Sequence, residues 1–193
     1  MMTEQYKKNN FSIKETSLNG VFEIEPFYSE DRRGTFYKTY NSQLFHDKTV
    51  NYDIKEIFFA ESKKGVLRGL HFQLKKQQRK LVQCVKGNIY DVVVDLNPQS
   101  PTFKKWQGFD LNGSNLKALL IPRYCAHGYY AKEDSIVCYM CDEIFFQEGD
   151  SGIRWDDPTI NIDWNIDSEP ILSDKDEKLM SFVDYLTKIS DNQ

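Results

Sequence analysis

The sequence contains no apolar run that approaches the ~20 residues of a membrane-spanning helix, and residues 1–12 are polar, without the apolar core of a signal peptide. It has no internal repeat and no low-complexity tract. Basic residues are not in excess, because the net charge is −4, which argues weakly against nucleic acid as the main partner. We therefore expect a cytoplasmic protein whose main partner is neither nucleic acid nor a membrane. A small anion held by a few arginines remains compatible with this charge.

Cysteine is scarce, and of the four residues only Cys138 and Cys141 have the spacing of a metal site or a redox motif. They lie in a segment that is typical of a strand, where residues three apart point to opposite faces, so the two thiols cannot share one metal ion. No second CxxC is present, and a redox motif would place its first cysteine at the start of a helix. We predict that all four cysteines are reduced core thiols.

The 193 residues are long enough for one domain with a substantial core, with residues 1–10 as a frayed terminus. Short segments of strand-like composition alternate with turn signals, and this pattern predicts an all-β barrel or sandwich. The 13 Phe, 11 Tyr and 3 Trp suit a sheet protein. The predicted strands are 20–27, 35–40, 54–60, 66–72, 80–85, 89–96, 106–111, 118–121, 127–131 and 136–146.

Two local predictions concern the connections. The dipeptide Gly87-Asn88 stands between two β-rich arms, which predicts a tight hairpin over residues 80–95. Residues 172–185 predict a helix with Ser173 as its N-cap and Asp176 as its capping partner, so that residues 173–193 form a helical tail.

The stretch from Gly65 to Gln73 places Arg68 three residues before His71. On a regular strand these two side chains would point to opposite faces. A bulge at Gly69 would bring them to one face, and an isolated glycine in a strand often marks a bulge. A lone histidine is more often an ordinary half-buried residue, so His71 needs support from elsewhere in the chain.

A second stretch, at 122–127, ends in His127, and together with the stretch around His71 it resembles the paired motifs of the cupin jelly roll. A metal-binding cupin would have a second histidine at position 73 and a glutamate soon after. The chain instead has Gln73 and a cationic run to residue 80. Because two histidines without a carboxylate make a poor site for a first-row metal, we expect a metal-free pocket.

Eight short motifs follow one another at 31–36 (Asp-x-Arg-Gly-x-Phe), 65–72 (Gly-Val-Leu-Arg-Gly-Leu-His-Phe), 80–87 (Lys-Leu-Val-x-Cys-Val-x-Gly), 91–95 (Asp-Val-Val-Val-Asp), 100–103 (Ser-Pro-Thr-Phe), 126–128 (Ala-His-Gly), 152–158 (Gly-Ile-x-Trp-x-Asp-Pro) and 172–176 (Leu-Ser-Asp-Lys-Asp). Their order and spacing resemble the dTDP-4-dehydrorhamnose 3,5-epimerase family. The resemblance implies a cupin-type jelly-roll barrel with a short C-terminal helical segment. It also implies an isomerase without a cofactor that inverts C3 and C5 of a nucleotide-linked 4-keto-6-deoxy sugar for cell-surface polysaccharide and dTDP-rhamnose biosynthesis.

Inversion next to a ketone requires a base on one face, a group that stabilises the enolate oxygen, and an acid on the other face. By position His71 resembles the family's base, and Asp176 resembles the carboxylate that orients it. Tyr139 resembles the acid, and its reference pKa of about 10 keeps a phenol protonated at neutral pH. Lys80 resembles the lysine beside the keto oxygen, and His127 a second active-site histidine.

Arg68 and Arg33 resemble the arginines that grip the diphosphate, a role that suits the guanidinium fork. Phe36 resembles an aromatic that stacks on the nucleotide base. In the family this residue comes from the partner subunit, so the resemblance implies a homodimer with a shared active site. The remaining candidates for substrate contact are Gln73, Lys175 and Glu56.

Each candidate also has a purely structural interpretation. Asp176 is equally well explained as a helix cap, and Lys80 as a solvated strand end. Tyr139 is one of eleven tyrosines, most of which serve a core, and Arg33 lies in a turn. The joint pattern favours the functional interpretation.

The chain departs from the family pattern at a few positions. Glu56 and Phe58 stand where the family has Gln and Asn, Lys38 stands where it has an acid, and Tyr124 replaces a glycine. Positions 56, 58 and 38 belong to the pocket that holds the nucleotide base in the family. A CDP- or GDP-linked sugar is therefore an alternative to a dTDP-linked one.

Other activities remain open from the sequence. Tyr139 favours inversion, yet it does not distinguish an epimerase for both carbons from one for C3 or C5 alone. A 3,4-ketoisomerase shares the fold. A metal-dependent cupin and a non-catalytic nucleotide-sugar binder are the alternatives from other functional classes.

Overall fold

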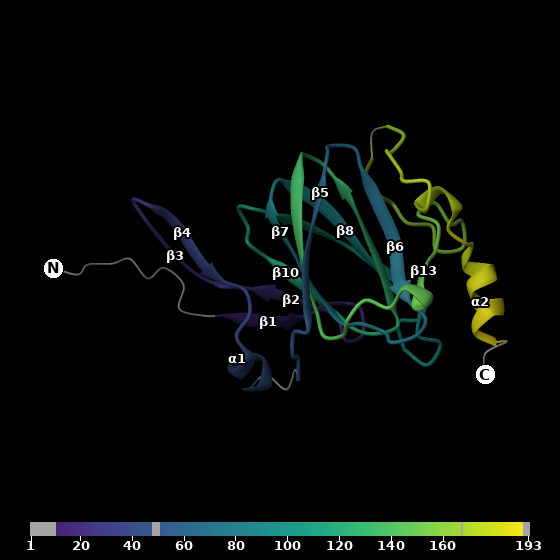
Figure 1. The fold of residues 1–193 in the computed structure, drawn as a ribbon, viewed down its shortest axis with the longest axis horizontal. Helices are drawn as coiled ribbons and strands as arrows, with labels where there is room; N and C mark the ends of the chain where they lie inside the picture. The colour runs from purple at the N-terminus through teal and green to yellow at the C-terminus, as the bar shows by residue number, and fades with distance from the viewer. Residues whose placement is uncertain (1–10, 48–50, 167, 191–193) are drawn as a thin grey trace.

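A computed structural model describes residues 11–190 except 48–50 and 167, so the predicted frayed terminus lies outside the described residues. Two antiparallel sheets face each other and form a barrel (Figure 1). The six-stranded sheet contains, in spatial order, β1 (Ser12–Glu15), β2 (Phe22–Glu25), β10 (Ala118–Ile121), β7 (Lys80–Lys86), β12 (Ser135–Cys141) and β5 (Glu56–Ser62). The five-stranded sheet contains β13 (Asp150–Gly152), β6 (Leu67–Gln73), β11 (Cys125–Ala131), β8 (Asn88–Asp95) and β9 (Trp106–Asn112). The predicted all-β jelly-roll architecture is confirmed.

Side chains alternate across both sheets, and this alternation creates three apolar layers. The central layer fills the barrel between the sheets, with Val82, Val93 and Tyr129 among its members. A second layer lies between the five-stranded sheet and the C-terminal segment, and a third lies on the outer face of the six-stranded sheet against the short helix α1 (Ser42–Asp47).

The cysteines lie where the strand pattern predicts. Cys141 belongs to the central layer, whereas Cys138 belongs to the outer layer beside α1, so the two thiols point to opposite faces of β12. All four cysteines are free and buried.

The predicted hairpin at Gly87 is wrong. β7 pairs with β10 and β12, whereas β8 pairs with β11 and β9, so the chain passes from one sheet to the other at Gly87. Gly87 has φ +81°, as a tight turn requires, and Asn88 donates its N–H to Ser135 Oγ. The dipeptide therefore marks a turn correctly, but the partner of each arm is decided by the distant strands β11 and β12.

Two predicted strands are shorter than the sequence pattern suggests. The segment 20–27 is interrupted at Pro26, which has no N–H for a ladder, and a new strand β3 (Phe27–Asp31) then pairs with β4 (Gly34–Lys38). The strand predicted to reach residue 146 ends at Cys141, because the buried carboxylate of Asp142 turns toward Arg79 and Arg123.

The predicted helix over 172–185 consists of two separate pieces. A 3-10 turn, η2 (Asp176–Lys178), is followed by extended backbone at Leu179 and then by the helix α2 (Phe182–Ser190). Ser181 and Asp184 form the hydrogen bonds that begin α2, three residues apart as in a capping box. In Figure 1, α2 lies against the outer face of the five-stranded sheet. Within the described part of the chain, no helix is long and apolar enough to cross a membrane.

Candidate active site

A bulge in β6 places Arg68 and His71 on one face of the sheet. His127 pairs with His71 and Tyr129 with Arg68, so two steps along β11 match three steps along β6. Gly69 has φ +120°, and a Cβ atom there would lie 2.6 Å from Cα of Gly128. Only glycine fits this close approach, and the extra residue turns both polar side chains toward the barrel interior.

The dyad of His71 and Asp176 joins β6 to the C-terminal segment. Nε2 of His71 lies 2.5 Å from Oδ1 of Asp176, and Ser173 Oγ donates to Oδ2 at 2.8 Å. Asp176 is only 3% exposed. Burial opposes its ionisation, but the hydrogen bonds from His71 and Ser173 outweigh burial and hold the pKa of this carboxyl below its usual value. A carboxylate is therefore present where an imidazolium would need a partner.

The same geometry supports the structural interpretation of Asp176. Its backbone N–H donates to Ser173 Oγ at 3.2 Å, which is the capping hydrogen bond expected from the sequence spacing, but the N-cap residue of the 3-10 turn is Lys175 and not Ser173 as predicted. The cap and the contact with His71 thus use different atoms of one residue, and neither excludes the other.

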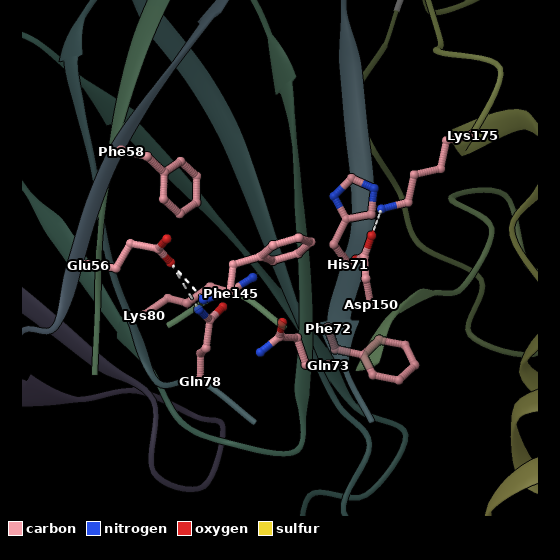
Figure 2. A pocket seen from close by; sticks show the side chains of 10 residues that line it. All are labelled: Glu56, Phe58, His71, Phe72, Gln73, Gln78, Lys80, Phe145, Asp150 and Lys175. Carbon is pink, nitrogen blue, oxygen red and sulfur yellow. Dashed lines mark hydrogen bonds and ion pairs between the residues drawn. The ribbon is translucent and has the colours of Figure 1, made fainter. Parts of the chain in front are cut away.

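His71 lies on the wall of an open pocket of about 380 Å³ between β5 and β6 (Figure 2). The pocket is lined by Glu56, Phe58, His71, Phe72, Gln73, Gln78, Lys80, Phe145, Asp150 and Lys175. Four of the predicted substrate or catalytic residues other than His71 therefore surround one space. These are Glu56, Gln73, Lys80 and Lys175.

Lys80 begins β7 and reaches the pocket from the side opposite His71 (Figure 2). Burial lowers the pKa of its ammonium, and nearby acidic groups that include Asp150 and Asp91 act in the opposite direction. A cation in such a poorly solvated position interacts strongly with any negative charge that forms in the pocket.

Tyr139 lies beside Phe58, a residue of the pocket wall. Its ring is 7% exposed and stacks on Phe58, with centroids 4.7 Å apart and an interplanar angle of 9°. Its second ring neighbour is His127, at 5.7 Å between centroids. Burial raises the pKa of the phenol well above its usual value of 10, so Tyr139 is protonated at neutral pH.

His127 and Asp91 form a buried pair inside the barrel. Nδ1 of His127 lies 3.5 Å from Oδ2 of Asp91, beyond normal hydrogen-bond distance, and the two residues are 4% and 0% exposed. Among the described residues, no hydrogen-bond partner serves Nδ1 of His127 or either carboxylate oxygen of Asp91. Burial raises the pKa of Asp91 and lowers the pKa of His127. Buried polar atoms without a hydrogen-bond partner, and buried groups with shifted pKa values, are typical of functional sites.

Two other predicted binding residues, Arg68 and Gln73, already make hydrogen bonds within the protein. Arg68 donates to Ser62 Oγ at 2.9 Å and to the carbonyl of Glu61 at 3.1 Å, beside Tyr129 in the barrel. Gln73 is 5% exposed, and its amide already bonds the carbonyl of Lys76 and the N–H of Phe146. This amide therefore holds the loop that forms the pocket floor.

Arg33 and Phe36 are not brought to this pocket. They lie on the β3–β4 hairpin, which projects away from the barrel (Figure 1). The Arg33 side chain is 85% exposed and pairs with Asp31, and Phe36 is 60% exposed. Within one chain, the site around His71 therefore lacks both residues.

Sequence reasoning missed several residues of the site. Gln78, Phe145 and Asp150 line the pocket, and Asp91 is buried beside His127. Asp91 carries a usable signal, because a carboxylate within the apolar run of β8 must be buried beside a partner. Phe145 stands in the segment that was wrongly assigned to a strand, so its place in a loop that lines the pocket was not predicted. In the part of the chain that the structure describes, no group of three or more His, Cys, Asp or Glu side chains could hold a metal ion.

Comparison with known proteins agrees with this geometry. Residues 15–184 match the family model described as dTDP-4-dehydrorhamnose 3,5-epimerase. A dTDP-4-dehydrorhamnose 3,5-epimerase of Methanothermobacter thermautotrophicus is 43% identical over 169 residues, which cover 86% of this chain and 91% of the relative.

Solved structures extend the similarity to the fold. A dTDP-4-dehydrorhamnose 3,5-epimerase of Bacillus anthracis with TDP and pyrophosphate bound has a TM-score of 0.86 at 39% identity, over 90% of this chain and 100% of the other. A dTDP-6-deoxy-D-glucose-3,5-epimerase of Legionella pneumophila in complex with dTDP-4-keto-L-rhamnose has a TM-score of 0.86 at 33% identity, over 89% of this chain and 93% of the other. The chain therefore belongs to the dTDP-4-dehydrorhamnose 3,5-epimerase family, a family of isomerases.

Proposed function

We propose that this protein inverts C3, C5 or both in a nucleotide-diphosphate-linked 4-keto-6-deoxy sugar by moving protons next to the ketone. The observation that carries the proposal is the His71–Asp176 dyad on the wall of a pocket that Lys80 also lines. A proton α to a carbonyl is acidic enough for an imidazole to remove once the enolate oxygen is stabilised.

In the proposed reaction, Nδ1 of His71 takes the proton, because Nε2 is held by Asp176. The carboxylate fixes the ring and stabilises the imidazolium that forms. The Lys80 ammonium stabilises the negative charge on the keto oxygen in a poorly solvated position. Tyr139 then donates its phenolic proton to the opposite face of the carbanion, which inverts the carbon.

The substrate class rests on basic side chains and on the relatives. Arg68 and Lys175 are the cations that we assign to the diphosphate and sugar, and the relatives of B. anthracis and L. pneumophila bind TDP and a dTDP-4-keto sugar respectively. A dTDP-linked sugar is therefore the first substrate to test.

One observation favours a different nucleotide. The Glu56 carboxylate lies in the pocket beside Phe145, and its Oε2 accepts the Phe145 N–H at 3.0 Å and the Gln78 amide at 3.4 Å. A carboxylate on this wall is suited to accept hydrogen bonds from an exocyclic amine, which cytosine and guanine carry and thymine lacks. Calorimetry that compares the binding of dTDP, CDP and GDP tests this alternative. Tightest binding of dTDP would reject a CDP- or GDP-linked substrate.

We also propose a homodimer with shared active sites, because Arg33 and Phe36 lie on a projecting hairpin away from their own pocket. Mixing an Arg33→Ala/Phe36→Ala double variant with a His71→Asn variant tests this. In a mixed dimer, one site would combine an intact pocket with an intact hairpin, so activity should exceed that of either variant alone. Activity equal to the sum of the separate variants would reject a shared site.

The experiment for the function itself uses a dTDP-4-keto-6-deoxy sugar and the His71→Asn variant. We expect the wild type to form the epimer and the variant to bind the sugar without forming it. Equal binding by both proteins with no epimer from the wild type would instead indicate a binding protein.

A further inference from the structure

Phe58 is the pocket residue that stacks on Tyr139. In the pairing of β5 with β12, Phe58 stands directly opposite Tyr139, and the two rings stack nearly parallel. Phe58 lines the pocket that contains His71, whereas Tyr139 is not among the residues described on that wall. Figure 2 shows the Phe58 ring on the β5 side of the pocket, above Glu56.

Phe58 lies on an edge strand, so its ring covers Tyr139 on the side that faces the solvent. β5 is the last strand of the six-stranded sheet, and within the described residues no strand pairs with its other edge. Tyr139 is nevertheless only 7% exposed, whereas Phe58 is 39% exposed. Because the outer ring meets the solvent and the inner ring does not, Phe58 shields Tyr139 from water on this side.

The stack also restricts the orientation of the phenol. Tyr139 contacts His127 at 5.7 Å and Phe58 at 4.7 Å between ring centroids, so two neighbouring rings define its position. Stacked aromatic pairs prefer offset geometries at these separations, which makes rotation of either ring unfavourable. An acid that must reach one face of a carbanion requires this restriction, because small displacements reduce proton transfer strongly.

We propose that Phe58 is a positioning residue for Tyr139, which keeps the phenol dry and directed so that the carbanion is reprotonated with inversion. The proposal rests on the role of Tyr139 in the proposed function. Without the ring of Phe58, removal of the proton by His71 continues, but delivery from Tyr139 slows. The proton on His71 then has more time to exchange with solvent, and the carbanion returns more often to the starting sugar by taking a solvent-derived proton back from His71.

The test is carried out in D₂O and measures both inversion of the carbanion and its return to the starting sugar. In the Phe58→Ala variant, the rate of deuterium entry should stay near that of the wild type, while the share of deuterium found in recovered substrate rises. A ratio of substrate deuteration to inversion higher by about two- to tenfold corresponds to the loss of one stacked aromatic pair. Phe58→Leu, which keeps apolar volume without the ring, should show most of this change, and Phe58→Tyr should restore the ratio of the wild type.

Phe59→Ala is the matched control. It removes the same ring from the next position on β5, where the side chain is 64% exposed and stands opposite Cys138. We expect the wild-type ratio in this variant. If Phe58→Ala lowers deuterium entry and inversion in equal proportion, or matches Phe59→Ala, the positioning role is wrong.

A second readout does not depend on substrate. Titration of ¹³C-labelled tyrosine, with Tyr139→Phe to assign the signal, should show that the pKa of Tyr139 falls toward 10 in Phe58→Ala because water reaches the phenol. An unchanged Tyr139 titration would contradict the shielding. Absence of any deuterium entry in the wild type, with a lowered Tyr139 pKa in Phe58→Ala, would reject the proposed function and leave the shielding in place.

Discussion

Nε2 of His71 lies 2.5 Å from Oδ1 of Asp176, although 105 residues separate the two in the chain. The contact links the bulged strand β6 to the turn that precedes α2, so the proposed catalytic dyad forms only when the C-terminal segment packs against the barrel. Under the proposed function, folding and catalysis therefore depend on the same segment.

Replacement of either member of the dyad should abolish most activity without unfolding the protein. We expect His71→Asn and Asp176→Asn each to lower kcat by about 10²- to 10⁴-fold, the range for loss of a general base or of the group that orients it. Ser173→Ala is the control, because it removes the two hydrogen bonds between Ser173 Oγ and Asp176 and leaves the His71 contact. A fall in Ser173→Ala as large as that in Asp176→Asn would contradict a special role for the dyad.

Tyr139→Phe should separate proton removal from inversion. The variant keeps the ring and its stack on Phe58 but has no phenolic proton. We expect inversion to fall by about 10²- to 10⁴-fold while His71 still exchanges the substrate proton with solvent. Nuclear magnetic resonance of the sugar in D₂O measures both rates. Inversion at the wild-type rate would exclude Tyr139 as the acid.

Gly69→Ala should destabilise the protein more than Gly34→Ala, although the two glycines have nearly equal φ values of +120° and +118°. Both variants incur a backbone strain of about 1–3 kcal/mol. At position 34 no atom lies within 4 Å of the new Cβ, whereas at position 69 it would lie 2.6 Å from Cα of Gly128. We expect about 1–3 kcal/mol of additional loss for Gly69→Ala from this overlap. Urea unfolding of both variants provides the comparison, and equal losses would show that the bulge tolerates a side chain.

Asp176 should make stability depend on pH in the acid range. Its folded-state pKa lies below the ordinary value of 3.8, so the ionised carboxylate contributes stability that is present above that value and lost as pH falls through the folded-state pKa. The unfolding free energy of the wild type should therefore fall more steeply than that of Asp176→Asn as pH drops below 3.8. Parallel curves for the two proteins would show that the carboxyl titrates alike in the folded and unfolded states.

The strands were predictable because alternation and turn residues are local properties, and β10 begins and ends at the residues that the sequence indicates. Gly87 shows the limit of this reasoning. A turn residue sets the direction of the chain, but the pairing of β7 and β8 with other strands depends on contacts with residues up to 61 positions away in the sequence.

In the candidate site, too, local features were predictable from the sequence and contacts between distant residues were not. The bulge at Gly69 follows from a glycine inside a strand, whereas the partnership of His71 with Asp176 came from the family resemblance, because no local pattern relates positions 71 and 176. Phe145 was missed because its loop resembles a strand in composition. Its actual place depends on Gln73, which holds the neighbouring N–H of Phe146.

The central claim is that His71 removes protons next to the ketone and that Tyr139 returns them on the opposite face. The most direct measurement is the deuterium content at C3 and C5 after the wild type acts on a dTDP-4-keto-6-deoxy sugar in D₂O. We predict solvent deuterium at each inverted carbon, no deuterium at the other ring carbons, and no incorporation with His71→Asn. Inversion without deuterium, or incorporation that persists in His71→Asn, would contradict the account.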